Sequence, residues 1–294
     1  MKYAAISLNL DSLGWIYGFT ANYQDPTFFQ VVDRFFAIAN KYNFKYIIYV
    51  IGKDLEKPEN REQVRAWARD GHEIGNHSWS HHIDLASLPR AAMYEEVKLG
   101  HDIIAQTVGY APRGFISPAW TTSRALYQVL NELHYDYDTS AFPSWLMFSV
   151  MIKNLINYLG NDKMGSIFCR KDFSTLLWGK RQVYNQGSVK VLPLPTNRFR
   201  VACWHTLGFM IGWKRHQQLL KSCLREIDAF YYLVHPADLM DRRDLDSGQK
   251  VPLERLRMSL EEKINHLERA IETILQSGRK IITMSELAQR HKII

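Results

Sequence analysis

Residues 71–81, GHEIGNHSWSH, contain the strand and the loop that decide the fold class of this chain. Gly71 follows a helical pattern that ends at Arg69, as a glycine often does just beyond a helix. HEIGNHS then has the length and pattern of a short strand, and it leads into a loop with two histidines, His77 and His81. A helix, a strand and a polar strand end in this order are typical of one unit of a parallel α/β sheet.

The same alternation continues in both directions from this loop. The stretch KYIIYVI at 45–51 is an apolar strand before it, and a helix from about Pro89 to Val108 follows it. A long helical pattern starts at Pro252 and ends at Gly278. Seven or eight strand and helix units predict a distorted (β/α) barrel in preference to an open sheet. The remaining strand-like stretches are AAISLNL, RGFISP, YDYDTS, KVLPLP, FYYLVHP and KIIT.

One segment, residues 143–185, interrupts the alternation. At 294 residues the chain has the length of one large α/β barrel, so we expect a single domain over residues 1–294 with this segment as an insertion. We interpret the insertion as an apolar helical segment, too short to cross a bilayer, which needs about 20 apolar residues. It is rich in Trp, Met, Phe and Leu, and its later part carries Lys163, Arg170, Lys171, Lys180 and Arg181.

The composition is that of a soluble globular protein, with 46% hydrophobic residues and a mean hydropathy of -0.27. The net charge of +7 favours anionic partners, but the basic residues are spread along the chain without a recognisable nucleic-acid module. We therefore expect no nucleic-acid partner. Three cysteines without a CxxC spacing fit a reducing cytoplasm. The N-terminal MKYAAISLNL is predicted to be a first strand and not a signal peptide.

Five polar residues lie where predicted strands end: Asp11, His77, Ser117, Asp138 and His235. In barrels of parallel strands the chemistry lies at the carboxyl ends of the strands. Side chains from distant parts of the sequence are therefore expected to meet at one edge of the sheet, where they would form the active site.

The two histidines of the loop allow two interpretations. Imidazoles four residues apart on one turn can both face a divalent ion, and one carboxylate completes three ligands while leaving room for water and substrate. The alternative is a polar loop whose two histidines lie at the surface and bind nothing. A helical zinc protease is excluded, because HSWSH lacks the glutamate that follows the first histidine in such sites.

The wider stretch GHEIGNHSWSH resembles the second motif of the polysaccharide deacetylase family, the NodB-like amidohydrolases. The resemblance continues in order along most of the chain, in LNLDS at 8–12, PRGFISPAW at 112–120, YDYDTSAFP at 135–143 and YLVHP at 232–236. HSWSH and LVHP match specifically, whereas LNLDS and PRGFISPAW depart from the family's motifs. The loop HSWSHH at 77–82 is also similar to that of the deformylases acting on aminoarabinose linked to undecaprenyl phosphate.

The resemblance implies a metal-dependent hydrolase that removes an acetyl or formyl group from a sugar, which is lipid-linked in the deformylase branch. It implies His77 and His81 as metal ligands and His235 as the general acid. Alternate side chains of a strand share a face, so Asn9 and Asp11 point the same way. Family members with an Asp-x-Asp motif use the first carboxylate as base and the second for the metal. On that pattern Asn9 stands in the base position and Asp11 is the third metal ligand.

A second register is less favoured, since Asp11 as base and Ser12 in the ligand position would leave the metal without a carboxylate. In the first register the general base is missing, because the amide of Asn9 cannot accept a proton from water. The arginine that orients the base in the family also has no counterpart, because Ile116 and Ser117 occupy its neighbourhood.

Three explanations of the missing base remain open. Asp138, at another strand end, could substitute for it, although it could equally be a structural turn residue. A metal-bound hydroxide could form without direct help, at some cost in rate. Finally, the protein could be a catalytically impaired carbohydrate-binding descendant of the fold.

The predicted cofactor is a divalent metal, with zinc as the default for a nitrogen and oxygen ligand set, although cobalt, iron or nickel would satisfy the same residues. The predicted partner is a carbohydrate or a lipid-linked sugar. Segment 143–185 is interpreted as a lid or as part of an oligomer interface. Alternatively, Trp145 and Phe148 dip into a membrane while the basic residues meet phosphate headgroups. The predicted location is the cytoplasm, at the inner membrane face under that alternative.

Overall fold

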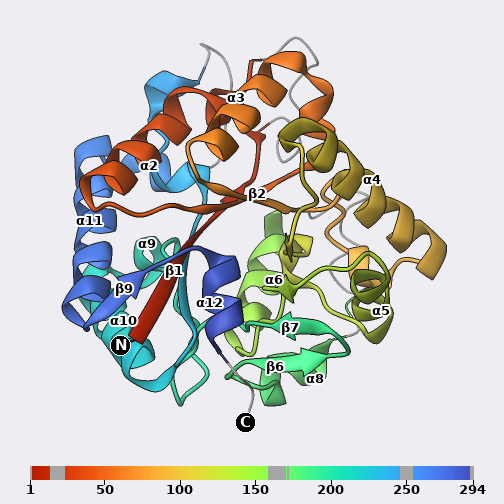
Figure 1. The fold of residues 1–294 in the computed structure, drawn as a ribbon. Helices are drawn as coiled ribbons and strands as arrows, with labels where there is room; N and C mark the ends of the chain where they lie inside the picture. The colour runs from red at the N-terminus through yellow and green to blue at the C-terminus, as the bar shows by residue number, and fades with distance from the viewer. Residues whose placement is uncertain (1, 14–23, 158–169, 171, 246–253, 292–294) are drawn as a thin grey trace.

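A curved, mainly parallel sheet forms the centre of the molecule (Figure 1). The computed structural model describes residues 2–13, 24–157, 170, 172–245 and 254–291. Strands follow the order β6-β7-β5-β4-β3-β2-β1-β8, with β9 beside β1, and β6 alone is antiparallel to its neighbour in the described sheet. The strands are β1 (Lys2–Leu10), β2 (Ile47–Val50), β3 (Glu73–Asn76), β4 (Gly114–Phe115), β5 (Tyr137–Asp138), β6 (Tyr184–Gln186), β7 (Val189–Val191), β8 (Phe230–Val234) and β9 (Arg279–Ile281).

Helices connect successive strands and lie around the outside of the sheet (Figure 1), which is the arrangement that repeated βαβ units require. The α-helices are α2 (Gln30–Lys41), α3 (Pro58–Arg69), α4 (Arg90–Val108), α5 (Arg124–Glu132), α6 (Leu146–Asn157), α8 (Phe173–Trp178), α9 (Leu207–Ile211), α10 (Trp213–Glu226), α11 (Leu260–Gln276) and α12 (Met284–Arg290). Short 3-10 helices span Pro26–Phe28, Gly52–Glu56, Leu85–Ser87, Pro118–Trp120, Pro236–Asp238, Arg242–Asp244 and Glu254–Arg257.

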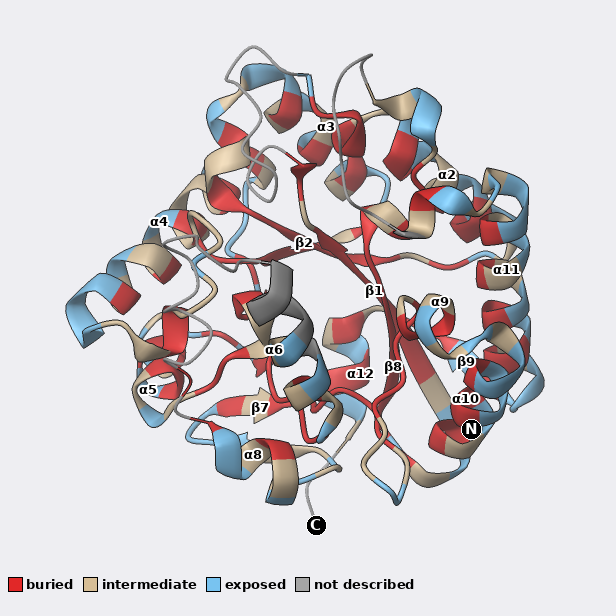
Figure 2. Ribbon diagram, turned by 180° about the vertical axis from the view of Figure 1, so that it is seen from behind, coloured by how far each residue is buried: buried red, intermediate tan, exposed pale blue. Residues whose placement is uncertain are grey.

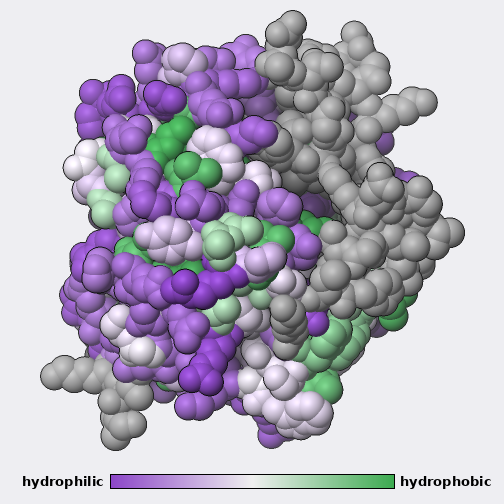
Figure 3. All heavy atoms as spheres, turned by 90° about the vertical axis from the view of Figure 1, so that its right-hand side faces the viewer, coloured by the Kyte–Doolittle hydropathy of each residue, from purple (hydrophilic) through white to green (hydrophobic). Residues whose placement is uncertain are grey.

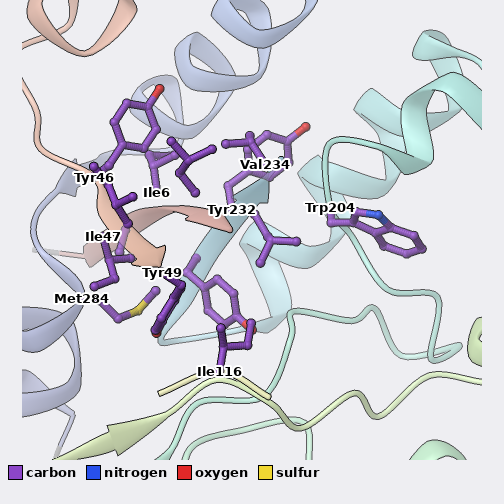
Figure 4. Packing of buried hydrophobic residues seen from close by; sticks show 14 of the residues in the cluster. Ile6, Tyr46, Ile47, Tyr49, Ile116, Trp204, Tyr232, Val234 and Met284 are labelled. Atoms are coloured by element: carbon purple, nitrogen blue, oxygen red, sulfur yellow. The ribbon is translucent and has the colours of Figure 1, made fainter. Parts of the chain in front are cut away.

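The first strand, β1, is the one strand of the described sheet that pairs with three others. It is buried from Ala4 to Leu10 and pairs with β8 on one side and with β2 and β9 on the other (Figure 2). Side chains of neighbouring strands, among them Ile6, Ile47 and Val234, pack together in the core (Figure 4). A strand buried on both faces explains why its sequence is an almost continuous apolar run.

The distortion of the barrel lies between β7 and β8, where an irregular segment, residues 192–205, takes the place of strand pairing. At one end of this segment the backbone N–H of Leu192 donates to the carbonyl oxygen of Asp138, and at the other that of His205 donates to Leu233. The predicted α/β class and distorted barrel are confirmed.

The long helix α11 begins later than the sequence pattern predicts. It starts at Leu260 and not at Pro252, which lies outside the described residues. Ser259 caps the helix: its hydroxyl accepts from the N–H of Glu262, whose carboxylate accepts from Ser259 in return. Ser259 has an extended backbone, so the apolar residues before it belong to a separate short turn. The predicted end at Gly278 is confirmed.

The described parts of segment 143–185 pack against the barrel. Met147 of α6 and Leu176 of α8 are buried in the main core, and the indole N–H of Trp145 donates to the carbonyl oxygen of Phe199 over 3.0 Å. The prediction of one inserted apolar segment falls partly on 158–169 and 171, which lie outside the described residues.

Candidate functional site

The carboxylate of Asp11 and the imidazoles of His77 and His81 meet at the carboxyl end of the sheet. Oδ1 of Asp11 lies 3.2 Å from Nε2 of His77 and 3.7 Å from Nε2 of His81. One ligand atom from each residue lies within 4.8 Å of the other two, an arrangement that no other His, Cys, Asp or Glu side chains share in the described part of the chain. A single ion about 2 Å from each atom fits this spacing.

The register of three neighbouring strands brings two of these residues together. Leu10 of β1 pairs with Val50 of β2, and Val50 pairs with Asn76 of β3. Asp11 follows Leu10 at the end of β1, and His77 follows Asn76 at the end of β3. Both residues therefore lie at the same edge of the sheet, with β2 between them. Parallel strands therefore place side chains that are 66 residues apart in sequence within reach of one ion.

A backbone carbonyl sets the orientation of His77. Nδ1 lies 2.8 Å from the carbonyl oxygen of Ile116, which can only accept, so Nδ1 carries the proton of the neutral ring. Nε2 then presents its lone pair to Asp11. Two lone-pair atoms 3.2 Å apart repel unless a cation or a proton lies between them. A metal-binding histidine is commonly held in this way by a carbonyl on its other nitrogen.

The loop after His77 has a constrained backbone. Ser78 and His81 have positive φ angles of 64° and 56°, a conformation that costs a non-glycine residue about 1 kcal/mol. Hydrogen bonds hold it: the N–H of His81 donates to Oγ of Ser78, and the N–H of Gly52 donates to the carbonyl oxygen of Ser78. Strain of this kind, maintained by neighbours, is frequent at functional sites.

Electrostatics also fit a metal ion. Burial alone would raise the pKa of Asp11, but the close contact with the ring of His77 and the nearby rings of His235 and His81 lower the pKa overall. Burial lowers the pKa of His81 to about 4, so this ring is neutral at pH 7. An ionised carboxylate and neutral imidazoles are the forms that bind a divalent metal. The donor set therefore fits the ion that the sequence predicts.

His235 lies beside this group, with its two nitrogens in different surroundings. Nε2 is 3.9 Å from Oδ2 of Asp11, and Nδ1 is 3.2 Å from the hydroxyl of Thr206. The ring edge faces Trp120 at a centroid separation of 6.0 Å. Burial lowers the pKa of His235, opposed by the charges of Asp11 and Asp238. The position suits proton transfer at the edge of the metal group.

Asn9 is buried on β1, two residues before Asp11, and its Oδ1 accepts a long hydrogen bond of 3.5 Å from Ser7. Ser12, the ligand of the second register, is buried too, and its hydroxyl has no hydrogen-bond partner among the described residues. Asp11, and not Ser12, lies next to both histidines, so the geometry favours the first register.

Asp138 is not brought together with the metal group. Its carboxylate accepts from the hydroxyl and the N–H of Ser140, and at 3.5 Å from the hydroxyl of Tyr127 on α5. Within the described residues it has no hydrogen bond or ion pair with Asp11 or either ligand histidine. Burial raises the pKa of Asp138 to about 7, with the Ser140 hydrogen bonds opposing. Its pKa would suit a base, but its hydrogen bonds tie it to Ser140 and Tyr127.

Arg170 is one of the site's neighbours whose role the sequence does not reveal. Its guanidinium forms a buried ion pair with Asp172 at 2.8 Å and donates to the carbonyl oxygens of Ala119 and Trp120. Both of these residues have positive φ angles. Arg170 therefore holds the turn that carries Trp120 toward His235, and it is not free to meet a headgroup as the sequence suggested.

The sequence also gives no prediction for Thr206 and Asp238, which contact Nδ1 of His235 and one another. Asp238 had a weak signal, because an aspartate three residues after a strand-ending histidine can cap the turn between them. Thr206 had none. In the described chain no helix has the length and apolar character required to span a bilayer.

Comparisons with known proteins agree with this geometry. A family model described as polysaccharide deacetylase matches residues 23–137, which contain β2 to β4 and the histidine loop. The uncharacterized protein YlxY of Bacillus subtilis is 27% identical over 103 residues, 35% of this chain and 31% of its own. The peptidoglycan deacetylase of Helicobacter pylori is 28% identical over 110 residues, which are 37% of this chain and 36% of that protein. The matches thus span about a third of the length of these relatives.

Solved structures share the fold over nearly the whole chain. A putative polysaccharide deacetylase from Mycobacterium smegmatis has a TM-score of 0.59 at 15% identity, covering 98% of this chain and 88% of that one. BA3943 from Bacillus anthracis, a pseudoenzyme of the CE4 family, has a TM-score of 0.54 at 13% identity, covering 99% of this chain and 67% of that one. At such identities the likeness shows the fold alone. The family-model match over residues 23–137, carried on this fold with the histidine loop at its strand ends, supports a NodB-like polysaccharide deacetylase.

Proposed function

We propose that this protein hydrolyses the N-acyl group of a sugar, acetyl or formyl, with the help of a divalent metal ion. The observation that carries the proposal is the meeting of Asp11, His77 and His81, whose ligand atoms lie within 4.8 Å of one another. The match of residues 23–137 to a polysaccharide deacetylase family model supports the class of substrate. Zinc is the expected ion for one carboxylate and two imidazoles.

Each residue of the centre then has a distinct task. When bound, the metal would polarise the acyl carbonyl and make its water more acidic. Asp11, His77 and His81 would hold it, with the Ile116 carbonyl fixing the ring of His77. His235 would protonate the departing sugar nitrogen, since its Nε2 faces the centre.

Metal analysis of protein purified without chelator tests the first step. We expect about one equivalent of zinc or a similar ion in the wild type, and acetate release from an N-acetylated chitooligosaccharide. His77→Ala should abolish both. His101→Gln is the matched control, because His101 lies on α4 and bonds to Tyr135, outside the metal group. Metal retained in full by His77→Ala would overturn the site.

A second candidate, a sugar-binding protein without catalysis, is favoured by Asn9 alone. A protein of this fold, BA3943, is described both as a pseudoenzyme and, as a mutant, as having restored activity. Restoring the carboxylate by Asn9→Asp should raise acetyl hydrolysis if the base is the missing part. An inactive wild type that still binds the oligosaccharide, together with an active Asn9→Asp variant, would establish the second candidate.

We also propose that a lipid-linked sugar reaches this site from a membrane surface on the cytoplasmic side. Described residues of α6, α8 and the turn at 197–200 expose large apolar side chains: Trp145 44%, Ile152 60%, Phe173 39%, Trp178 74% and Phe199 65%. Trp145 bonds to the backbone of Phe199, and the ring of Phe173 stacks on Phe148, so these elements are adjacent. In the side view of Figure 3 the coloured residues are mostly hydrophilic, apart from a hydrophobic area at the lower right.

Cations accompany this apolar surface. The guanidinium of Arg198 lies 4.8 Å from the ring centre of Phe199, and Lys180 lies beside Tyr184, whereas Arg181 is paired with Glu226. Exposed aromatic rings beside unpaired cations are typical of contacts with anionic membranes. Liposomes with anionic lipid should therefore pellet the protein, and Trp178→Ser with Phe199→Ser should leave most of it in the supernatant. Leu99→Ser, on α4, is the control. Equal pelleting of all variants would refute the contact.

A further inference from the structure

Behind His235, the half-buried Thr206 and the buried Asp238 form a chain of hydrogen bonds that leads away from the metal group. The hydroxyl of Thr206 lies 3.2 Å from Nδ1 of His235 and 3.0 Å from Oδ1 of Asp238. Asp238 is fully buried, and it also accepts from the backbone N–H of His235 at 2.9 Å and from Arg255 at 2.8 Å. The side chain at the edge of the centre is thus connected to an interior ion pair.

The partners of Thr206 decide which nitrogen of His235 carries the proton. Arg255 and the neighbouring histidines lower the pKa of Asp238 against the effect of burial, so this carboxylate is ionised and can only accept. The one hydroxyl proton of Thr206 must therefore point to Asp238. Its oxygen is then left to accept from His235, which requires the proton on Nδ1. In the neutral ring, Nε2 is bare on the side that faces Asp11.

We propose that Thr206 is a positioning residue that presents the bare Nε2 of His235 to the centre, and that this nitrogen takes the proton of the attacking water in place of the carboxylate that position 9 lacks. The inference rests on the proposed function and deepens it. Asn9 leaves the centre without its expected base, and Asp138 is held by Ser140 and Tyr127. Among the described side chains of the centre that do not hold the metal, His235 lies beside the metal group and has a free lone pair.

The proton balance needs no further group. As the water oxygen bonds to the acyl carbon, its O–H bond breaks and the proton goes to Nε2 of His235. That N–H bond then breaks as the carbon–nitrogen bond of the substrate breaks, and the same proton goes to the sugar nitrogen. Between the two steps the ring is an imidazolium, which Thr206 and the charge of Asp238 stabilise through Nδ1, as a buried carboxylate does in hydrolytic triads.

Histidine NMR of the metal-free protein tests the position of the proton without any reaction. Long-range 1H–15N spectra at pH 8 distinguish the two neutral tautomers, and His235→Gln identifies the signals of His235. We expect the Nδ1–H form in the wild type and in Thr206→Ser, and a changed or mixed tautomer in the isosteric Thr206→Val. A wild type in the Nε2–H form would overturn the proposal whether or not Thr206→Val folds, and so would an unchanged tautomer in Thr206→Val.

Kinetics with the zinc-loaded protein and an N-acetylated chitooligosaccharide test the base role. Thr206→Val should lower kcat about 100-fold with KM within about twofold, and Thr206→Ser should recover most of the loss. When Asn9→Asp is also present, Thr206→Val should lower kcat by less than about tenfold, because the carboxylate at position 9 can then take the proton. An equal loss in both backgrounds would refute the base role.

The two levels of the proposal fail separately. An active wild type in which Thr206→Val costs as much kcat as it does in the Asn9→Asp background would refute the base role of His235 and leave the deacetylase function standing. An inactive wild type beside an active Asn9→Asp variant would refute the base role and favour the second candidate, the sugar-binding protein without catalysis. If both proteins lack activity on acetylated and formylated sugars, the proposed function fails and the base role fails with it. The tautomer spectra still decide whether Thr206 positions the ring.

Discussion

The lone pair of His77 that faces the Asp11 carboxylate has a direct thermodynamic consequence. A cation between these atoms relieves their repulsion, so zinc should raise the Tm of the metal-free protein. An ion at a hundred times its Kd adds about 2.7 kcal/mol to the free energy of unfolding. Asp11→Asn should lose most of this Tm shift in thermal melts with and without zinc.

The control is Asp136→Asn, which removes a carboxylate from an exposed ion pair with Arg113. This variant should keep the full shift. A zinc-dependent shift in Asp11→Asn equal to that of the wild type would mean that the ion binds elsewhere.

Single residues were predictable where a local pattern fixes their place. His77 and Asp11 follow strands with clear apolar patterns, so their edge of the sheet could be deduced. Asp138 also follows a strand, but β5 has two residues, and so short a strand does not reveal which face its side chain takes. Thr206 could not be found, because its role arises only when the turn that carries it packs beside the end of β8.

Among the elements, α4 packs closely against the histidine loop at Gly100. A Cβ there would lie 2.5 Å from Oδ1 of Asn76 and 3.0 Å from the backbone of Ser78. Gly100→Ala should therefore push the helix from the loop, destabilise the fold by about 1 to 3 kcal/mol and weaken zinc binding. Chemical denaturation and zinc titration measure the two effects.

Gln106→Ala on the exposed face of the same helix is the matched control, and it should change neither quantity. Unaltered zinc affinity in Gly100→Ala would show that the helix can shift without disturbing the ligands.

The cap of α11 gives a second prediction at this scale. Ser259→Ala removes the hydroxyl that accepts from Glu262 and should lower the free energy of unfolding by about 1 kcal/mol. Ser259→Asp keeps an acceptor and should restore it. Urea denaturation measures both, and a neutral Ser259→Ala would mean that the preceding turn supports the helix by itself.

The same cap shows why this boundary was misjudged from sequence. Apolar spacing continues through Leu256 into the helix, so the pattern suggested one element from Pro252. The serine and the glutamate three residues later decide the actual start, and their signal is local hydrogen bonding and not periodicity.

For the molecule as a whole, two buried histidines predict a loss of stability in acid. Burial lowers the pKa of His205 to about 3 and that of His216 to about 4. The unfolded chain binds protons on these rings below about pH 6.5 while the folded chain does not, so stability falls between about pH 6.5 and 4. His216 alone accounts for about 3 kcal/mol over this range.

Urea denaturation at pH 7.5, 6, 5 and 4.5 measures this slope, which should flatten in His216→Gln. His134→Asn, at an exposed position with a positive φ that asparagine tolerates, should keep the slope of the wild type. A slope that does not change in His216→Gln would assign the acid sensitivity to other groups.

The order of the parallel strands and the helices between them was predictable for the described residues, whereas the antiparallel strand β6 and the closure of the barrel were not. Alternation specifies parallel neighbours, because a crossover helix joins each pair. Nothing in residues 192–205 indicates that this irregular segment would lie between β7 and β8, since its backbone bonds run to partners on two distant strands, at Asp138 and Leu233. Such tertiary hydrogen bonds leave no periodic signal.

The pairing of β1 on both edges has a consequence for biosynthesis. One edge of this strand pairs with β2 soon after both leave the ribosome, but the other edge waits for β8, which follows β1 by more than 200 residues. At about 5 to 20 residues per second, an apolar edge stays open for tens of seconds. During that interval a nascent chain of this protein is a natural client for chaperones, and slow translation between β2 and β8 should increase its aggregation.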